Sequence, residues 1–396
     1  VIFEEPSSLE RIGEHAFNKC NSLISIKIPK SIKTIESSAF LDCSSLSQIT
    51  FEEPSSLETL ESFIFSGCVS LTNIEFPSSI TKIQQNAFNN SSLSQVTFSE
   101  PSSIKTLNAS VFNNFSSLKH INIPNSVTKI EERAFSRCSL IKVTIPSSVT
   151  EIGKYSFEGC TSLIQIELSS SLNTIEKCLF NGCSSLLKID IPSSVTQICG
   201  SAFSFCTSLT QVTIGSSVTS IGGSAFSGCS SLVQAIIPET VTEIGGYAFA
   251  GCSSMLELTI PVGVTQILDS TFKGCSSLTK ITIPSTIKII GKSSFEGCKS
   301  LSKIDLPQDI TSIDKYAFQG CSSIVEINIP SSVEVIEESV FKGCTKLSKV
   351  TIPTTIKSIQ NFAFNECSSL AEIKIPTSVT FIGESSFSGC SSLSQI

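Results

Sequence analysis

A phenylalanine recurs along this chain at a nearly fixed interval, and that interval constrains the fold more than any other feature. From Phe157 onward every step is 23 residues. Earlier steps run from 22 to 25 because Glu52-Glu53 and Ser99-Glu100 are inserted before a proline, and because the segment before the repeat leucine is one residue short at 91–93 and 138–140. A fixed period of this length is typical of a solenoid. The anchor phenylalanines are Phe17, Phe40, Phe65, Phe88, Phe112, Phe135, Phe157, Phe180, Phe203, Phe226, Phe249, Phe272, Phe295, Phe318, Phe341, Phe364 and Phe387.

The first part of each repeat has the pattern of a β-strand. In one late repeat, Leu278, Ile281 and Ile283 occupy the first, fourth and sixth positions, and the Ile-Thr-Ile alternation predicts a strand with one buried face. Pro284 follows, and it has no N–H to give to a ladder. We therefore expect the strand to end before Pro284 and the chain to turn.

The second part of each repeat predicts a short extended segment and then one helical turn. Ile287 and Ile290 supply inward-facing apolar side chains after the turn, and Gly291 allows the backbone to bend where a side chain would crowd it. Phe295 and Cys298 then lie three residues apart, which suits one side of a single α or 3₁₀ turn.

The repeats predict one continuous domain over residues 1–396, with about 17 units of about 23 residues. A single unit cannot bury its own apolar face, so each must pack on its neighbours. Val1 and Ile396 both correspond to the fourth position of a strand, and neither end carries an atypical capping unit. We interpret the chain as a fragment of a longer protein.

The repeat resembles a known family. The pattern Leu-x-x-Ile-x-Ile-Pro-x-x-Val-x-x-Ile-Gly-x-x-Ala-Phe-x-x-Cys, nearly complete at 209–231 and at 370–392, is similar to the repeats of BspA-like surface antigens of bacteria, trichomonads and Entamoeba. The resemblance implies a leucine-rich-repeat horseshoe or superhelix with a parallel, concave β-sheet. It also implies surface exposure and adhesion to host cells, matrix proteins or other microbes.

One column of hydroxyl residues stands where ordinary leucine-rich repeats place an asparagine that ties successive turns together. We expect these hydroxyl groups to bond to the backbone instead, because buried polar groups in the turn must be satisfied. The column consists of Ser171, Ser194, Ser217, Thr240, Thr286, Ser332, Thr355 and Ser378.

Composition and charge argue against several functional classes. The net charge of −7 comes from 27 basic and 34 acidic residues without a run of one sign, which disfavours nucleic acid as a partner. No apolar stretch is long enough to insert into a membrane. His15 and His120 lie on distant repeats, and Gly222-Gly223 lacks the context of a phosphate loop. We therefore expect neither an enzyme nor a bound cofactor.

The cysteines follow the same period. Fifteen of the 17 stand three residues after an anchor phenylalanine, and Ser91 and Phe115 take that place in two repeats. A position that accepts phenylalanine is a packing position, and the spacing lacks the Cys-x-x-Cys of a zinc site. We expect buried free thiols, with Cys178 and Cys199 as the exceptions to be tested for pairing or reactivity.

The strand side chains that face away from the core are the candidate binding surface, because a curved sheet aligns them on its concave side. They are mixed in charge and rich in Gln, which suits a protein or glycan ligand, although solvated sheet faces are polar for solubility alone. At the third position they are His120, Lys142, Gln165, Lys188, Gln211, Gln234, Glu257, Lys280, Lys303, Glu326, Lys349 and Glu372.

A second set of side chains lies two residues before the anchor, and we expect partial burial for these aromatic rings. They are Phe63, Tyr155, Tyr247, Tyr316 and Phe362.

Three functions remain open at this point. The first is a cell-surface or secreted adhesion module that binds host or microbial proteins or glycans. The second is a cytoplasmic scaffold or regulator that docks a protein such as a phosphatase or kinase, since free thiols suit a reducing compartment. The third is a passive spacer or antigenic decoy without a specific ligand.

Overall fold

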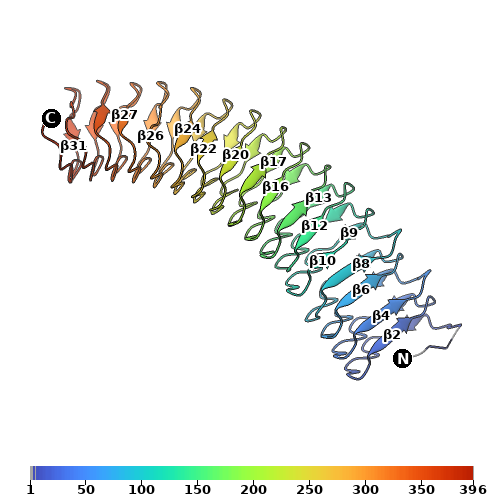
Figure 1. Ribbon diagram of the computed structural model, residues 1–396. Coiled ribbons are helices and arrows are strands. Elements are labelled where there is room, and N and C mark those ends of the chain that lie inside the picture. Colours follow the sequence, from blue (N-terminus) through green and yellow to red (C-terminus); the bar gives the residue numbers. More distant parts are fainter. Residues whose placement is uncertain (1–2, 5, 396) are drawn as a thin grey trace. The chain divides into compact units, whose positions relative to one another are not determined.

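The computed structural model describes residues 3–4 and 6–395. They form two compact units, residues 1–194 (unit 1) and 195–396 (unit 2). Within each unit the chain winds into successive coils, and each coil is one sequence repeat (Figure 1). The fold is a parallel-strand solenoid of the leucine-rich-repeat type, as the period predicts.

The first row of strands follows the repeat leucine. In unit 1 these strands are β2 (Ser25–Ile28), β4 (Gln48–Phe51), β6 (Asn73–Phe76), β8 (Gln95–Phe98), β10 (His120–Ile121), β12 (Lys142–Thr144), β14 (Gln165–Glu167) and β16 (Lys188–Asp190). In unit 2 they are β18 (Gln211–Thr213), β20 (Gln234–Ile236), β22 (Glu257–Thr259), β24 (Lys280–Thr282), β27 (Glu326–Asn328) and β29 (Lys349–Thr351).

The second row consists of two-residue strands and follows the turn at the proline. In unit 1 these are β1 (Arg11–Ile12), β3 (Thr34–Ile35), β5 (Thr59–Leu60), β7 (Lys82–Ile83), β9 (Thr106–Leu107), β11 (Lys129–Ile130), β13 (Glu151–Ile152) and β15 (Thr174–Ile175). In unit 2 they are β17 (Gln197–Ile198), β19 (Ser220–Ile221), β21 (Glu243–Ile244), β23 (Gln266–Ile267), β25 (Ile289–Ile290), β26 (Ser312–Ile313), β28 (Val335–Ile336), β30 (Ser358–Ile359) and β31 (Phe381–Ile382).

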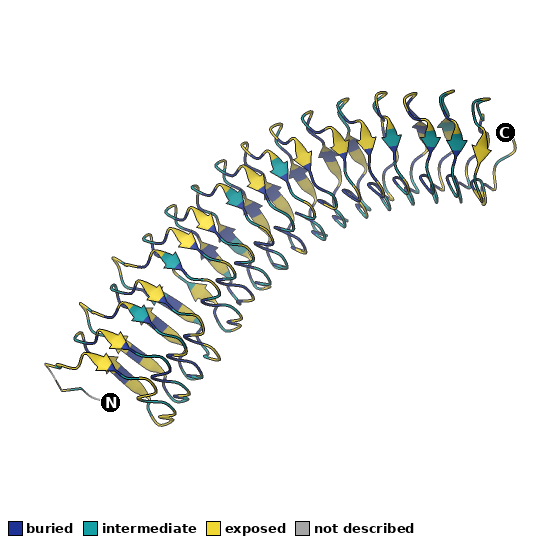
Figure 2. Cartoon of the chain, turned by 180° about the vertical axis from the view of Figure 1, so that it is seen from behind, coloured by how far each residue is buried: buried dark blue, intermediate teal, exposed yellow. Residues whose placement is uncertain are grey.

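Pairing is parallel and keeps like positions side by side. In β22 and β24, Glu257 pairs with Lys280 and Leu258 with Ile281. The buried and exposed residues alternate along both rows, as the two-residue period of a strand requires (Figure 2). Strand β24 ends at Thr282, so the predicted stop before the proline is confirmed.

The segment from the second row to the cysteine is not helical, and the predicted helical turn is wrong. No helix occurs in residues 3–4 and 6–395; a run of tight turns takes its place. Ser38 and Asp42 have φ of 59° and 57°, and two left-handed residues four apart interrupt a helix. The amides of Ser38, Phe40 and Asp42 donate to carbonyl oxygens of the next coil at 3.1, 3.0 and 2.8 Å, whereas those of Ala39 and Leu41 donate three residues back. Successive amides of this segment thus alternate: one donates to the next coil, and the following one donates within its own coil.

The anchor phenylalanines stack face to face along the interior of each unit. Ring centroids of neighbours are 5.1 to 5.6 Å apart in unit 1 and 5.2 to 5.9 Å apart in unit 2. The rings of Phe226 and Phe249, for example, are tilted by only 8°.

The hydroxyl column ties coils together at several positions, as predicted. The hydroxyl groups of Ser194, Thr240, Thr286 and Thr355 donate to backbone carbonyl oxygens of the preceding coil at 2.6 to 2.9 Å. Ser378 departs from the prediction, because its buried oxygen has no partner among the described residues.

The glycine after the second-row strand permits a close backbone approach. A Cβ atom at Gly245 would lie 2.3 Å from the amide nitrogen of Gly223 and 2.7 Å from the carbonyl carbon of Gly222. This crowding confirms the reason the sequence suggested for glycine at this position.

The ladders of unit 1 are interrupted at three junctions. Hydrogen-bonded pairing of the first row stops between β4 and β6, between β10 and β12, and between β14 and β16. The turn segments continue to bond across the first two of these junctions, where the amides of Phe65 and Phe135 donate to carbonyl oxygens of the next coil. Between the coils of Phe88 and Phe112 the reverse holds in the described chain: β6 pairs with β8, but neither ring stacking nor turn hydrogen bonds join the two coils.

Candidate functional site

The candidate site is the strand face, which we define as the outward-facing residues at the second, third and fifth positions of the first row. Its third-position residues align wherever the ladder is paired. Lys142 lies beside Gln165 in unit 1. In unit 2, Gln211, Gln234, Glu257 and Lys280 follow one another in register.

Not every predicted residue lies in a continuous ladder. Glu326 pairs with Lys349, whereas Lys303 lies outside the named strands and Glu372 takes part only in an isolated bridge to Gln395. In unit 1, interruptions of the ladder separate His120 from Lys142. All twelve third-position side chains are exposed or partly exposed.

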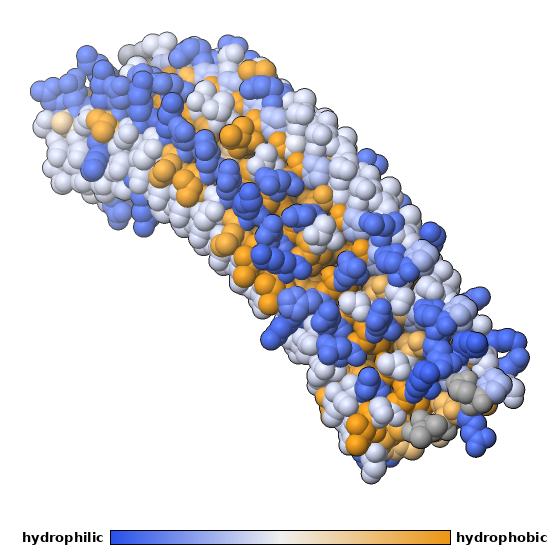
Figure 3. Space-filling view, turned by 45° about the vertical axis from the view of Figure 1, so that its right-hand side comes forward, coloured by the Kyte–Doolittle hydropathy of each residue, from blue (hydrophilic) through white to orange (hydrophobic). Residues whose placement is uncertain are grey.

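Apolar side chains at the second position also belong to this face, and the sequence analysis missed them. Large aliphatic residues there are 40 to 66% exposed, although each directly follows the apolar first residue of its repeat, which is buried in every case except Leu23. The sequence signal was available, since an aliphatic residue after the repeat leucine cannot share its buried side. Apolar side chains are visible among hydrophilic ones in the space-filling view (Figure 3). These residues are Ile24, Ile164, Leu187, Val233, Leu256 and Val325.

Two ion pairs of the strand face, one in each unit, lie in highly exposed positions. Lys188 lies 3.8 Å from Asp190 and Lys303 lies 3.2 Å from Asp305, each within one strand segment. All four side chains are more than 60% exposed, so these pairs contribute little to stability. Ile236 occupies the fifth position in β20 and is 69% exposed.

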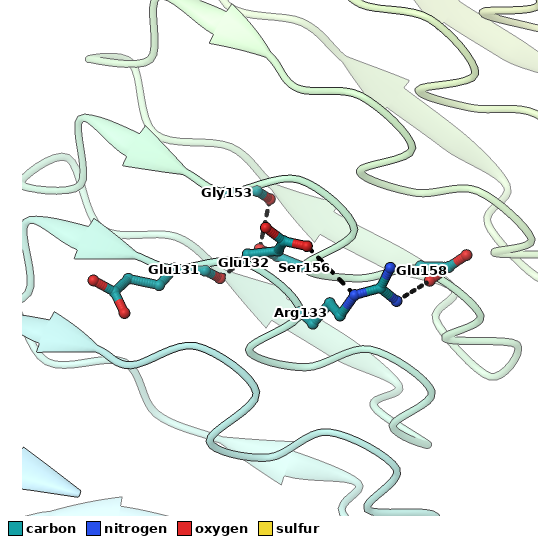
Figure 4. A network of polar contacts seen from close by, with 6 residues as sticks. All are labelled: Glu131, Glu132, Arg133, Gly153, Ser156 and Glu158. Atoms are coloured by element: carbon teal, nitrogen blue, oxygen red, sulfur yellow. Dashed lines mark hydrogen bonds and ion pairs between the residues drawn. The ribbon is translucent and has the colours of Figure 1, made fainter. Parts of the chain in front are cut away.

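A second surface, on the side of the second-row strands, carries a polar network in unit 1. Arg133 connects Glu132 at 3.4 Å with Glu158 at 3.2 Å, and its guanidinium group lies 4.3 Å from the centroid of Tyr155 (Figure 4). The hydroxyl of Ser156 lies within hydrogen-bonding distance of the carbonyl oxygen of Glu131 in the preceding coil and of Gly153 in its own coil. This network joins coils and leaves no buried unpaired group that would hold a ligand.

The thiol column is buried and free, as predicted, and it has a bonding role that the sequence did not reveal. The thiol of Cys298 donates to the carbonyl oxygen of Phe272, the anchor of the preceding coil, at 3.2 Å. The same contact recurs along both units. None of the 17 cysteines forms a disulfide in the described chain, and only Cys20 and Cys199 are not buried.

Burial makes these thiols poor nucleophiles. Desolvation raises the pKa of Cys68, Cys160, Cys229, Cys275 and Cys344 from 9.0 to about 12. Cys178 is buried, and Cys199 is half-buried. The column therefore serves packing and hydrogen bonding rather than chemistry.

The aromatic residues two places before the anchor are partly buried, as predicted. Phe63 is 40% exposed and Tyr247 is 50% exposed, and the other three are intermediate. Tyr316 donates its hydroxyl to Glu338 at 2.8 Å.

Two other kinds of feature are absent from the described residues, 3–4 and 6–395. No group of three or more His, Cys, Asp or Glu side chains is arranged to hold a metal ion. None of these residues forms a helix with the length and apolarity needed to cross a membrane.

Comparison with solved structures supports the fold. A leucine-rich repeat protein from Bacteroides ovatus ATCC 8483 is 27% identical, with a TM-score of 0.60, over 97% of this chain and 81% of that chain. A leucine rich cell surface protein from Faecalibacterium prausnitzii A2-165 is 29% identical, with a TM-score of 0.39, over 87% and 83% of the two chains. No curated protein matches the chain significantly.

The family follows from a direct match to its sequence model. The model described as "BspA type Leucine rich repeat region (6 copies)" matches residues 2–115, 52–164, 97–210, 179–302 and 265–394. These matches overlap and extend over nearly the whole chain, including both units. Proteins built from such repeats are generally non-catalytic. The repeat period, the parallel solenoid and this match together place the chain in the family of BspA-type leucine-rich-repeat proteins.

Proposed function

We propose that this chain is a non-catalytic binding module, displayed at a cell surface or secreted, that recognises host or microbial proteins or glycans along its strand face. The observation that carries the proposal is the exposed aliphatic row at the second position beside the aligned polar row at the third. Solubility alone accounts for the polar row. It does not account for Ile164, Leu187, Val233 and Leu256, because exposed aliphatic side chains gain nothing from water.

The surface location rests on the family resemblance. The free thiols do not favour the cytoplasmic alternative, because all except those of Cys20 and Cys199 are buried and thereby shielded from oxidants. A passive spacer would need no exposed aliphatic row. An antibody against this segment should therefore stain intact source cells, and staining only after permeabilisation would contradict the surface location.

A charge-reversal variant tests the strand face directly. Lys280, Lys303 and Lys349 are exposed at the third position in unit 2. Changing all three to Glu should weaken adhesion of the purified chain to its target cells several-fold, because it reverses the local charge without touching the core. Circular dichroism should be unchanged.

The matched control carries the same charge change elsewhere. Lys299, Lys346 and Lys357 are also exposed in unit 2 but lie outside the first-row strands. Their triple change to Glu should leave adhesion intact. Equal loss in both variants would indicate an effect of net charge and would remove the support for this face.

A further inference from the structure

A hollow opens on the strand face of unit 1 where the first-row ladder is interrupted. Residues 165–168 comprise β14 and the residue after it, and residues 188–191 comprise β16 and the residue after it. Within the described chain no hydrogen bond joins these two segments. A hollow of about 450 Å³ lies at this junction. Backbone polar groups that a closed ladder would satisfy are thus left to solvent or to a ligand.

The hollow exposes aliphatic surface. Ile166, Leu168, Ile191 and Pro192 line it. Leu168 is half-buried, whereas Ile145 and Ile191, at the same position of the adjacent repeats, are only 3% and 4% exposed. Leu168 therefore exposes side-chain surface beside the hollow that the two adjacent coils bury.

Two carboxylates lie beside this aliphatic surface. Glu167 and Asp190 also line the hollow, and they are the only acidic residues that stand at the fifth position of consecutive repeats. Like charges on neighbouring strands destabilise a sheet. Lys188 compensates only in part, at 3.8 Å from Asp190, because both side chains are more than 60% exposed. Glu167 accepts a hydrogen bond from Thr144 at 3.3 Å and has no ion pair in the described chain.

We propose that this hollow receives a lysine or arginine side chain from an extended segment of a partner protein. A basic side chain combines an aliphatic stem with a cationic head, and the hollow combines an aliphatic wall with two carboxylates. Ile164 and Leu187, at the second position of the same two repeats, are 40% and 49% exposed and accept an apolar neighbour of that basic residue. This inference rests on the proposed function, since it assigns partner chemistry to the same face.

A defined pair of small probes tests the hollow on the purified full chain. We would titrate N-acetyl-leucyl-arginine methylamide into isotope-labelled protein and follow backbone amide shifts by NMR, with the citrulline analogue as an isosteric neutral probe. The arginine probe should shift amides of residues 164–168 and 187–191 saturably. The citrulline probe should bind about 10-fold more weakly, because it lacks the cation.

Three variants should differ in the direction of their effect on the affinity for the arginine probe. The Glu167→Gln/Asp190→Asn double variant should lose about 10-fold in affinity, and Lys188→Gln should gain affinity because the competing cation is gone. Asp305→Asn removes a fifth-position carboxylate, also paired to a lysine, that lies outside this hollow, and it should change nothing.

The outcomes separate this inference from the proposed function. Equal binding of the two probes, absence of saturable shifts, or indifference to the double variant would overturn the basic-side-chain assignment whatever the adhesion assay shows. Binding with these signs would support the hollow even if intact cells fail to stain.

Discussion

At the scale of single residues, the cysteine column shows how a packing position can also bond. Sequence reasoning found the position because it recurs with the anchor phenylalanine and because Phe115 replaces cysteine in one repeat. Phe115 is 9% exposed and packs edge-on against Phe112 at 5.9 Å, which confirms the packing role. The donation from thiol to carbonyl could not be predicted, because it depends on the distance between coils.

The buried thiols predict a loss of stability at alkaline pH. Below pH 9 the thiols are protonated in both states, whereas between pH 9 and about 12 the unfolded chain loses these protons and the folded chain keeps them, since burial raises the pKa of Cys275 to about 12. The free energy of unfolding should therefore fall across this interval. Urea denaturation at about pH 8 and about pH 10.5 measures the fall.

A one-thiol variant isolates this effect from lysine and tyrosine titration. Cys275→Ala is less stable at pH 8 because it leaves a small cavity, but its stability should fall less steeply with pH than that of the unchanged chain. Parallel declines in the two proteins would show that the thiol is not the group responsible.

At the scale of elements, the strands were predictable and the turn segment was not. The alternation around Ile281 and the missing N–H of Pro284 define a strand and its end by local chemistry alone. Phe295 and Cys298, three residues apart, suit a helical turn and a run of tight turns equally well. Residues with a left-handed backbone, such as Tyr155 with φ of 61°, distinguish the run of tight turns from a helical turn. A left-handed backbone could not be predicted at Tyr155, because aromatic residues rarely adopt it.

The glycine after the second-row strand predicts a steric effect that depends on the neighbouring coil. Gly245→Ala should destabilise the chain by about 1–3 kcal/mol, since its Cβ would lie 2.3 Å from the backbone nitrogen of Gly223. At Gly223 itself the nearest atom would be the oxygen of Gly246 at 3.3 Å. Gly223→Ala should cost less than about 1 kcal/mol. Chemical denaturation of both variants compares them, and equal losses would refute the backbone-clash explanation.

At the scale of the molecule, the period predicts that coils, not residues, are the unit of assembly. Removal of one whole period, residues 209–231, should leave the circular dichroism signal per residue unchanged and lower the unfolding midpoint moderately, because one interface between coils is lost. Removal of residues 209–219 should disrupt folding, since it brings strand positions against turn positions. Similar spectra for both deletions would mean that register between coils is not what holds the fold.

The period also explains the limits of prediction for the strand face. Parallel stacking aligned Glu257 with Lys280 because equal positions of equal repeats must meet. It could not show that the ladder opens between β14 and β16, because that opening depends on small displacements between coils. The hollow beside Glu167 could therefore not be predicted from the sequence.

The interrupted junctions of unit 1 have a mechanical consequence. Where β4 stops pairing with β6, the two coils remain bonded through their turn segments, whereas the coils of Phe88 and Phe112 remain bonded through β6 and β8 instead. Two coils that are hydrogen-bonded along only one edge resist separation, but bending about that edge requires little free energy. In unit 2 the turn segments bond at every junction from Phe203 to Phe387. Unit 1 should thus bend most readily between the coils of Phe88 and Phe112, and it can adjust its strand face to a partner there without unfolding either coil.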